Sequence, residues 1–445
     1  MVAAVLAGGL LAACAPLIAD DSSGKSTDWP RWRGPNGDGV SNETDWTSDW
    51  PADGPKQLWT AKIGVGFGSI AVADGRAYVM GHKRSTAKHG DESAKDDDAK
   101  DADDKTKVPD DEKKAKQGED FVWCFDAATG REIWHYSYPC KLVDNLHEGG
   151  PAATPTVDGN HVYTLSKEGH LFCFDVAKGD VVWKAELQKL FDVDMPGWGF
   201  SGSPQVFGDK LILDAGPTAA LNKNTGEVIW KTEKFSVGYG SPTFFSLGGE
   251  PLAAVLDNDF LLVVRIKDGS IVDKTPWKSP FSTSATTPIV EPTDKGAAIF
   301  VSTGYGTGCG LYDLADGKLA ERYKNKNMRN HMATCVPRDN VLFGFDGQSS
   351  PSSQAKLVAL NRDSGEVLWK QRGLGCGTLL RAGERLIILS DDGRLVIAEA
   401  SDKEYKELAS AKVLEGKCWS APILAAGRIY CRNAAGDLVC VDVRK

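Results

Sequence analysis

The sequence lacks an excess of positive charge. Its 52 Lys and Arg residues stand against 61 Asp and Glu residues, which gives a formal net charge of −9. No basic stretch with interleaved aromatic residues is present, and proteins that bind the phosphate backbone need such clustered cations. We therefore expect no nucleic-acid partner.

Apolar runs long enough to cross a bilayer are also missing. Residues 1–19 carry no charge and contain an apolar run from Val2 to Leu11, which is shorter than the roughly 20 residues of a membrane helix. We interpret residues 1–19 as an export signal that lacks the usual positive start. Residues 11–14 resemble a lipobox, so Cys14 is a candidate lipidation site, and ordinary cleavage near Ala19 is the alternative. We expect an exported protein of the periplasm or, through a lipid anchor, of the outer membrane.

Beyond Cys14 the chain has nine cysteines, so one thiol at least has no partner within the chain. Cys124 and Cys173 occupy the same place in two repeats of the chain, and Cys440 occupies it in a third, which is typical of small buried core residues. A two-residue turn between Cys431 and Cys440 would set them directly opposite each other on adjacent strands. We therefore treat Cys431 and Cys440 as a candidate disulfide.

The sequence does contain a repeated phrase: Asp or Asn, a short turn that ends in Gly, and a strand that closes with Trp. It runs from Asp126 to Trp134, from Asp175 to Trp183, from Asn222 to Trp230 and from Asn361 to Trp369, with degraded copies that we expect to close at Trp277, Tyr323 and Val413. The closing positions are 44–49 residues apart, which is the period of a four-stranded propeller blade. Gly supplies the positive φ of a tight hairpin, and Asp or Asn bonds to the amides of the turn.

This period predicts an all-β, eight-bladed β-propeller of four-stranded antiparallel blades over residues 56–445. The eighth unit, from Cys418 to Val443, has only three strands. We expect the segment 56–61, which carries Trp59, to supply the fourth strand and to close the ring at the N-terminal end, because closure removes exposed sheet edges. Residues 20–55 form a lead-in segment, and we expect a disordered charged insertion at residues 82–119.

The phrase on this period resembles the PQQ-repeat propellers, a family that includes quinoprotein dehydrogenases and the non-catalytic envelope lipoprotein BamB. The residues Phe200 to Pro204 and Tyr239 to Pro242 are similar to the inner-strand motif of the family, and the segment from Asp28 to Gly39 is similar to one that precedes many exported members. The resemblance implies the fold, whereas a shared fold does not by itself establish a function.

In a propeller, the loops between the last strand of one blade and the first strand of the next converge at one end of the central channel. Glycines in these loops let the backbone approach a ligand closely. We therefore place a candidate ligand-binding rim at His147, Glu148, Trp198, Phe200, Tyr239, Arg329, Asn330, His331 and Trp419.

We expect a non-catalytic, monomeric binding or scaffold protein of the cell envelope, with an envelope protein or peptide as partner and with no catalytic residue, cofactor or metal. The alternative is a PQQ-dependent dehydrogenase with PQQ and Ca²⁺ in the funnel, for which Trp198 or Trp419 could stack and Glu148 and Asn330 could supply oxygen atoms. The adjacent cysteines and the rim aspartate base of such enzymes are missing. A transition-metal site would have to combine His147, His331, Cys376 and Cys418 from separate blades. The sequence has no nucleophile elbow of a hydrolase.

Overall fold

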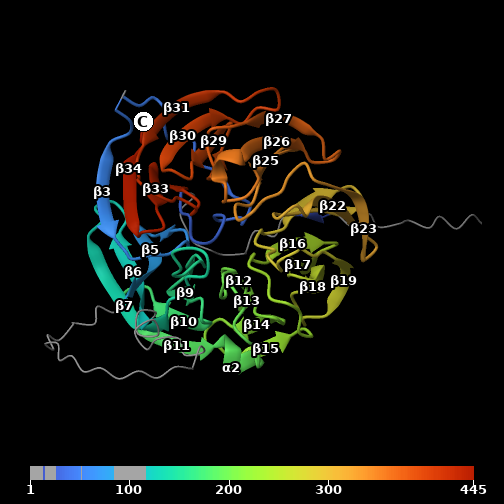
Figure 1. Ribbon diagram of the computed structural model, residues 1–445. Helices are drawn as coiled ribbons and strands as arrows, with labels where there is room; N and C mark the ends of the chain where they lie inside the picture. The colour runs from blue at the N-terminus through green and yellow to red at the C-terminus, as the bar shows by residue number, and fades with distance from the viewer. Residues whose placement is uncertain (1–13, 16–26, 52, 85–116) are drawn as a thin grey trace, which may run out of the picture.

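The strands form a ring of eight antiparallel blades around a central channel (Figure 1). The structure is a computed structural model that describes residues 14–15, 27–51, 53–84 and 117–445. The only helical elements in these residues are α2 (Leu187–Phe191) and the 3₁₀ helix η1 (Ser352–Gln354). The all-β, eight-bladed prediction is confirmed. No helix of the described residues is both long and apolar enough to cross a membrane.

Each blade is a meander. Its first strand lines the channel, and its fourth strand lies at the outer edge of the ring. Blade 1 contains β4 (Ala71–Ala73), β5 (Arg76–Arg84), β6 (Gln117–Asp126) and β7 (Glu132–Lys141); blade 2 contains β8 (Thr156–Asp158), β9 (His161–Leu165), β10 (His170–Asp175) and β11 (Val181–Glu186); blade 3 contains β12 (Gln205–Phe207), β13 (Lys210–Asp214), β14 (Thr218–Asn222) and β15 (Val228–Lys231); blade 4 contains β16 (Thr243–Leu247), β17 (Glu250–Leu256), β18 (Phe260–Arg265) and β19 (Ile271–Pro276).

The second half of the ring repeats this arrangement. Blade 5 contains β20 (Ile289–Thr293), β21 (Gly296–Thr303), β22 (Gly308–Ala315) and β23 (Lys318–Asn325); blade 6 contains β24 (Val336–Arg338), β25 (Val341–Asp346), β26 (Lys356–Asn361) and β27 (Val367–Gln371); blade 7 contains β28 (Thr378–Ala382), β29 (Arg385–Leu389), β30 (Arg394–Glu399) and β31 (Glu407–Lys412); blade 8 contains β32 (Ile423–Ala425), β33 (Arg428–Arg432), β34 (Asp437–Asp442) and β3 (Gln57–Lys62). Two short strands add to inner strands: β1 (Cys14–Ala15) pairs with β16, and β2 (Val40–Ser41) pairs with β28.

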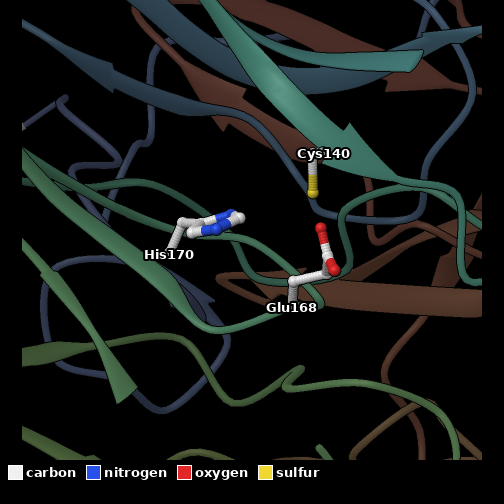
Figure 2. A group of neighbouring side chains, drawn as sticks. All are labelled: Cys140, Glu168 and His170. Atoms are coloured by element: carbon white, nitrogen blue, oxygen red, sulfur yellow. The ribbon is translucent and has the colours of Figure 1, made fainter. Parts of the chain in front are cut away.

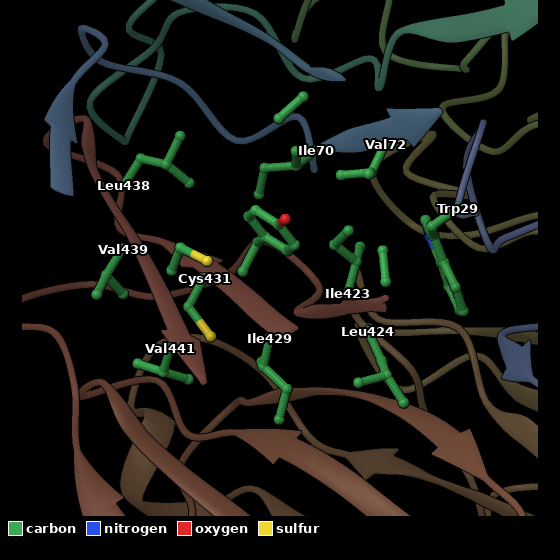
Figure 3. Packing of buried hydrophobic residues seen from close by; sticks show 14 of the residues in the cluster. Trp29, Ile70, Val72, Ile423, Leu424, Ile429, Cys431, Leu438, Val439 and Val441 are labelled. Carbon is green, nitrogen blue, oxygen red and sulfur yellow. The ribbon is translucent and has the colours of Figure 1, made fainter. Parts of the chain in front are cut away.

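The N-terminal strand β3 closes the ring by pairing with β34, as predicted. Trp59 lies opposite Cys440 in this antiparallel pair, and the amide of Ile63 donates to the carbonyl of Gly436 at 2.8 Å. Blade 8 packs against blade 1 through buried apolar side chains of both blades, among them Ile70 and Ile423 (Figure 3). The two ends of the propeller are therefore joined by a complete sheet and by a core.

An aromatic ring locks each of several blades to the next. The indole of Trp59 lies on Gly130, where a Cβ atom would come within 2.5 Å of the ring, and its Nε1–H donates to the carbonyl of Ala127 at 3.1 Å. Gly130 has a φ of 71°, so both the turn and the ring require glycine. The same contact recurs for Trp134 on Gly179, Trp183 on Gly226, Trp230 on Gly269 and Tyr323 on Gly365.

Where the ring is an indole, the residue that pairs with it on the neighbouring strand is small. Trp134 lies opposite Cys124, Trp183 opposite Cys173 and Trp59 opposite Cys440, and all three thiols are fully buried. The interpretation of these cysteines as small core residues is confirmed.

Two closing positions differ from the prediction. In blade 4 the residue that takes the place of the indole is Asp273, opposite Val263 at the bulge of the sheet, and Trp277 follows the strand and donates to Thr303 of blade 5 at 2.8 Å. In blade 7 the place is taken by Ala409, opposite Ile397, and not by Val413. The phrase is degraded in both blades, so the nearest large side chain was an unreliable marker of the register.

The predicted disulfide between Cys431 and Cys440 is wrong. Cys431 lies opposite Val439, and Cys440 lies opposite Tyr430, so the two cysteines are offset by one residue and do not share a face. Both thiols are free and buried. The turn between β33 and β34 spans four residues, from Asn433 to Gly436, whereas the prediction assumed two.

The insertion in blade 1 is narrower than residues 82–119. Residues 82–84 end β5, and residues 117–119 begin β6. Residues 85–116 lie outside the described residues, as does most of the segment 1–19. Acylation at Cys14 stays a prediction.

The lead-in segment forms a floor under the channel. Its bonds follow the chain order of blades 1, 2, 3, 5, 6 and 8: Trp29 pairs with Val72, Pro30 accepts from Val157, Arg31 donates to Val206, Trp32 donates to Thr287, Arg33 donates to Cys335, and Glu43 accepts from Gly427. Arg33 is buried, and its guanidinium group donates three hydrogen bonds, to the carbonyl groups of Gly37, Asp38 and Cys335. One segment thus holds many blades from the same side.

A belt of hydroxyl groups links the blades around the channel. The amide of Ser69 donates to Thr154 Oγ1 at 3.0 Å, and the amide of Thr154 donates to Ser203 Oγ at 2.9 Å. The same bond continues from Ser203 to Ser241 and from there to Thr287. Each amide is thereby satisfied by the neighbouring blade, which explains why a Ser or Thr precedes Pro in the inner-strand motif.

We predict that Trp59→Ala lowers the free energy of unfolding by about 3–5 kcal/mol, because it removes a buried ring at the closure of the propeller. Urea denaturation of the full chain measures this change. Trp419→Ala is the matched control, because Trp419 is only partly buried and its replacement should cost less than about 1.5 kcal/mol. Equal losses in the two variants would contradict the role assigned to Trp59.

Candidate functional site

At the end opposite the lead-in floor, the channel widens into a cavity of about 400 Å³, which we call the funnel. Its lining combines aromatic side chains, hydroxyl groups of the belt and two histidines. The residues are Trp32, Phe67, Leu146, His147, Ala152, Lys167, Trp198, Ser201, Ser203, Tyr239, Gly240, Ser241, Thr283, Ala285, Thr287, Tyr305, His331, Met332, Gln348, Ser349, Ser350, Trp419 and Ala421.

Five residues of the predicted rim line this cavity: His147, Trp198, Tyr239, His331 and Trp419. They come from the loops that precede the inner strands of blades 2, 3, 4, 6 and 8. The convergence of these loops at one end of the channel is therefore observed.

The other four predicted residues have structural contacts outside the lining. Glu148 pairs with Lys417 at 2.8 Å, and Phe200 is buried in the core between blades 2 and 3. Arg329 forms a bidentate pair with Asp346. Asn330 is buried, and its amide nitrogen donates to the carbonyl of Phe345 at 2.9 Å.

Three aromatic residues of the lining were missed by the choice of rim residues. Trp32 comes from the lead-in, whose resemblance to a family segment was noted without a role in the site. Phe67 lies between Gly66 and Gly68 in the loop between β3 and β4. Tyr305 belongs to the turn between β21 and β22, which is not one of the loops between blades, so the topological rule could not find it.

The aromatic side chains form a continuous row on one wall of the cavity. Phe67 stacks on Trp419 with 5.6 Å between ring centroids, and it meets His147 edge to face at 5.0 Å. His147 in turn stacks on Trp198 at 6.0 Å. The ammonium group of Lys417 lies 4.4 Å from the centre of the Trp419 ring. Such rings offer large, stiff apolar surfaces to a ligand.

The cavity histidines are held in the neutral form. Burial and, to a smaller extent, the nearby charge of Lys167 lower the pKa of His147 to about 4. Burial alone lowers the pKa of His331 to about 4; its Nε2 lies 2.8 Å from the hydroxyl of Tyr305. Burial also lowers the pKa of Lys167 to about 8. At neutral pH the lining thus carries at most one positive charge among the described residues.

The donor set of the cavity does not fit PQQ with Ca²⁺. The described residues of the lining include no Asp or Glu, whereas Ca²⁺ needs several oxygen ligands and the chemistry needs a carboxylate base. Glu148 is paired with Lys417, and Asn330 is bonded within the blade. His147, His331, Cys376 and Cys418 form no metal-ligating group in the part of the chain that the structure describes.

Two buried carboxyl groups support the loop that carries Tyr239. Asp214 accepts a hydrogen bond from the amide of Gly238 at 2.9 Å. Burial and the charge of Asp257 raise the pKa of Asp214 well above its usual range. Burial also raises the pKa of Asp257 to about 7, and its Oδ2 atom is buried without a hydrogen-bond partner.

The fold, the repeat phrase and the funnel define the class: an eight-bladed propeller of the PQQ-repeat type. A family model described as outer membrane protein assembly factor BamB matches residues 118–371 and 353–445. The chain belongs to this family. The curated relatives include the outer membrane protein assembly factor BamB of Yersinia pestis, 21% identical over 350 residues that cover 74% of this chain and 71% of the relative. The factor of the same name from Shewanella oneidensis is 22% identical and covers 69% of this chain and 78% of the relative.

Solved structures share the fold at lower identity. BamB from Moraxella catarrhalis superposes with a TM-score of 0.51 at 17% identity, covering 72% of this chain and 88% of that one. The quinohemoprotein alcohol dehydrogenase from Comamonas testosteroni superposes with a TM-score of 0.65 at 13% identity, covering 94% of this chain and 80% of that one. Both likenesses establish the fold alone.

We predict that Asp257→Asn changes the pH dependence of stability. A carboxyl group whose pKa rises on folding, here from 3.8 to about 7, contributes stability that is complete at low pH and is lost as the pH rises through about 7. The variant should therefore match the wild type near pH 4 and exceed its free energy of unfolding at pH 8 by roughly 2–4 kcal/mol. Urea denaturation at pH 4, 6 and 8 measures the difference.

Asp180→Asn, at an exposed position, is the control and should run parallel to the wild type at all three pH values. A parallel curve for Asp257→Asn as well would contradict the assignment of a raised pKa to this group.

Proposed function

We propose that this protein is a non-catalytic binding protein of the cell envelope and that its funnel holds a segment of a polypeptide partner. The observation that carries this proposal is the aromatic wall of a cavity whose described lining contains no carboxylate. Such a wall can bind apolar and aromatic side chains, and its described residues offer no carboxylate as a base or as a ligand for a metal ion.

The size of the cavity supports a peptide segment as occupant. A volume of about 400 Å³ lies within the range of small ligand sites, about 300–1,000 Å³, and is enough for a few side chains. Ser203, Ser241 and Thr287 line the same cavity, and their hydroxyl groups can bond to peptide groups that enter it. The loops around the opening can extend the contact, since blade strands are already paired with one another.

The family supports the identity of the partner. The relatives are named as outer membrane protein assembly factors, so we propose a component of outer-membrane assembly as the partner of this chain. An exported location in the periplasm or at the outer membrane fits this partner and the interpretation of residues 1–19, with Cys14 as the anchoring residue. The protein acts as a monomer in this proposal and uses neither PQQ nor Ca²⁺.

Site-directed photo-crosslinking tests the partner and the surface together. A photoreactive amino acid at position 419, on the cavity wall, should crosslink to an outer-membrane assembly component in intact envelopes, identified by mass spectrometry. The same group at Leu408, which is exposed on the outermost strand of blade 7, should not. Adding Trp198→Ala to the first variant should lower the yield at least about tenfold, as expected for loss of an anchoring ring. Crosslinks from position 408 alone would refute the proposed surface.

Titration with PQQ and Ca²⁺ separates the proposal from the dehydrogenase alternative. We expect no change in tryptophan fluorescence that saturates and no alcohol-dependent or aldose-dependent reduction of a dye, because the cavity offers no described carboxylate to the metal or to the substrate. Tight PQQ binding with turnover would show that the protein is an enzyme and would refute the proposal.

A further inference from the structure

A second group of polar side chains lies between blades 1 and 2 and is not part of the lining of the funnel. Cys140 stands near the end of β7, Glu168 lies in the turn between β9 and β10, and His170 begins β10. Their ligand atoms all lie within 4.8 Å of one another, and the three side chains point toward a common centre (Figure 2). This group brings together a thiol, a carboxylate and an imidazole from two blades.

The backbone fixes the turn that carries Glu168 and His170. Gly169 has a φ of 91°, and a Cβ atom there would come within 2.9 Å of Phe200, so the turn between Glu168 and His170 requires glycine. The amide of Lys141 donates to Glu168 Oε2 at 2.7 Å. This bond ties the turn of blade 2 to the strand that carries Cys140.

His170 is oriented through its other ring nitrogen. Nδ1 lies 3.2 Å from Ser166 Oγ, which also accepts from the amide of His170 at 2.9 Å. When Nδ1–H donates to this oxygen, Nε2 presents its lone pair, which is the arrangement of histidines that bind metals. The ring also packs edge to face on Tyr138, with centroids 5.6 Å apart.

The donor set suits zinc. A thiolate, an imidazole and a carboxylate are the ligands that Zn²⁺ takes in tetrahedral sites, often with water as the fourth ligand. Tetrahedral ligands at zinc distances are roughly 3.3–3.8 Å apart, so the observed group needs to contract by only about 1 Å. The charges of a thiolate and a carboxylate balance those of the ion, which leaves a neutral site in a largely buried place.

A buried histidine in the same interface also has an unused ring nitrogen. His82 pairs with Asp120 through Nδ1 at 2.8 Å, and both side chains are almost fully buried. Its Nε2 has no hydrogen-bond partner and lies over Gly118, where a Cβ atom would come within 2.5 Å of it. Gly118 is the residue opposite Cys140 in the sheet. The sheet of blade 1 that carries Cys140 thus also holds a buried ring nitrogen without a hydrogen-bond partner.

We propose that Cys140, Glu168 and His170 bind one Zn²⁺ ion, with water as the fourth ligand, and that the ion clamps blade 1 to blade 2. Binding replaces the proton of the Cys140 thiol by the metal and releases that proton to solvent. Sequence spacing did not point to this group, because Cys140 belongs to a different repeat from Glu168 and His170 and no metal had been expected.

Metal titration of the purified full chain tests the site. Isothermal calorimetry with Zn²⁺ should give one equivalent bound, and Co²⁺ in its place should produce a thiolate-to-cobalt charge-transfer band. Cys140→Ala should abolish this band, and both Cys140→Ala and His170→Gln should weaken zinc binding by about 100-fold or more. Zinc should also raise the melting temperature of the wild type and leave that of Cys140→Ala unchanged.

Two control variants keep the test specific. Cys173→Ala removes another buried thiol, and His135→Gln breaks an exposed His–Glu pair of 2.7 Å; both should bind zinc as the wild type does. Circular dichroism of every variant should show the same sheet content. No binding of zinc by the folded wild type, cobalt binding without a thiolate band, or equal affinities in Cys140→Ala and Cys173→Ala would overturn the proposal.

Discussion

The packing of an aromatic ring on the turn glycine of the next blade is the contact on which the ring depends. A four-stranded blade cannot bury its two faces alone, so its stability comes from its neighbours. The indole supplies a large apolar area together with one hydrogen bond to the turn, and glycine at the turn leaves room for it. The contact between Trp59 and Gly130 has the same form as the others, although Trp59 comes from the start of the chain. The N-terminal strand therefore completes blade 8 as an ordinary fourth strand.

The funnel is a consequence of two further constraints on the inner side of the ring. The hydroxyl belt satisfies amides between blades and places polar side chains along the channel. The lead-in crosses the other end of the channel, and the indole of Trp32 reaches the belt at Thr287. The result is a cavity that the lead-in closes at one end. Its wall is aromatic, and its histidines are neutral. The proposed binding of a polypeptide segment rests on these features.

Much of this architecture could be predicted from the sequence because the repeat phrase encodes a local contact. Wherever the Gly and the Trp are both present, as in blade 2, the number of strands, the register and the burial of Cys173 followed. Where the phrase is degraded, as in blade 4, the prediction chose Trp277 as the closing residue, whereas Asp273 occupies that position in the sheet. The offset of Cys431 and Cys440 was missed for a related reason, since the length of one turn decides which residues face each other. Tyr305 and the group around Cys140 depend on contacts between different blades, which no spacing in one repeat encodes.

Native-state hydrogen exchange of the unliganded full chain tests most directly whether the N-terminal strand is an integral part of blade 8. The amides of β3 and that of Ile63, which bonds to Gly436, should exchange as slowly as those of the fourth strands of blades 2 and 3, in one cooperative unit with β34. Exchange of β3 that is much faster than that of the other fourth strands, with β34 still protected, would contradict the closure and with it the position assigned to the funnel.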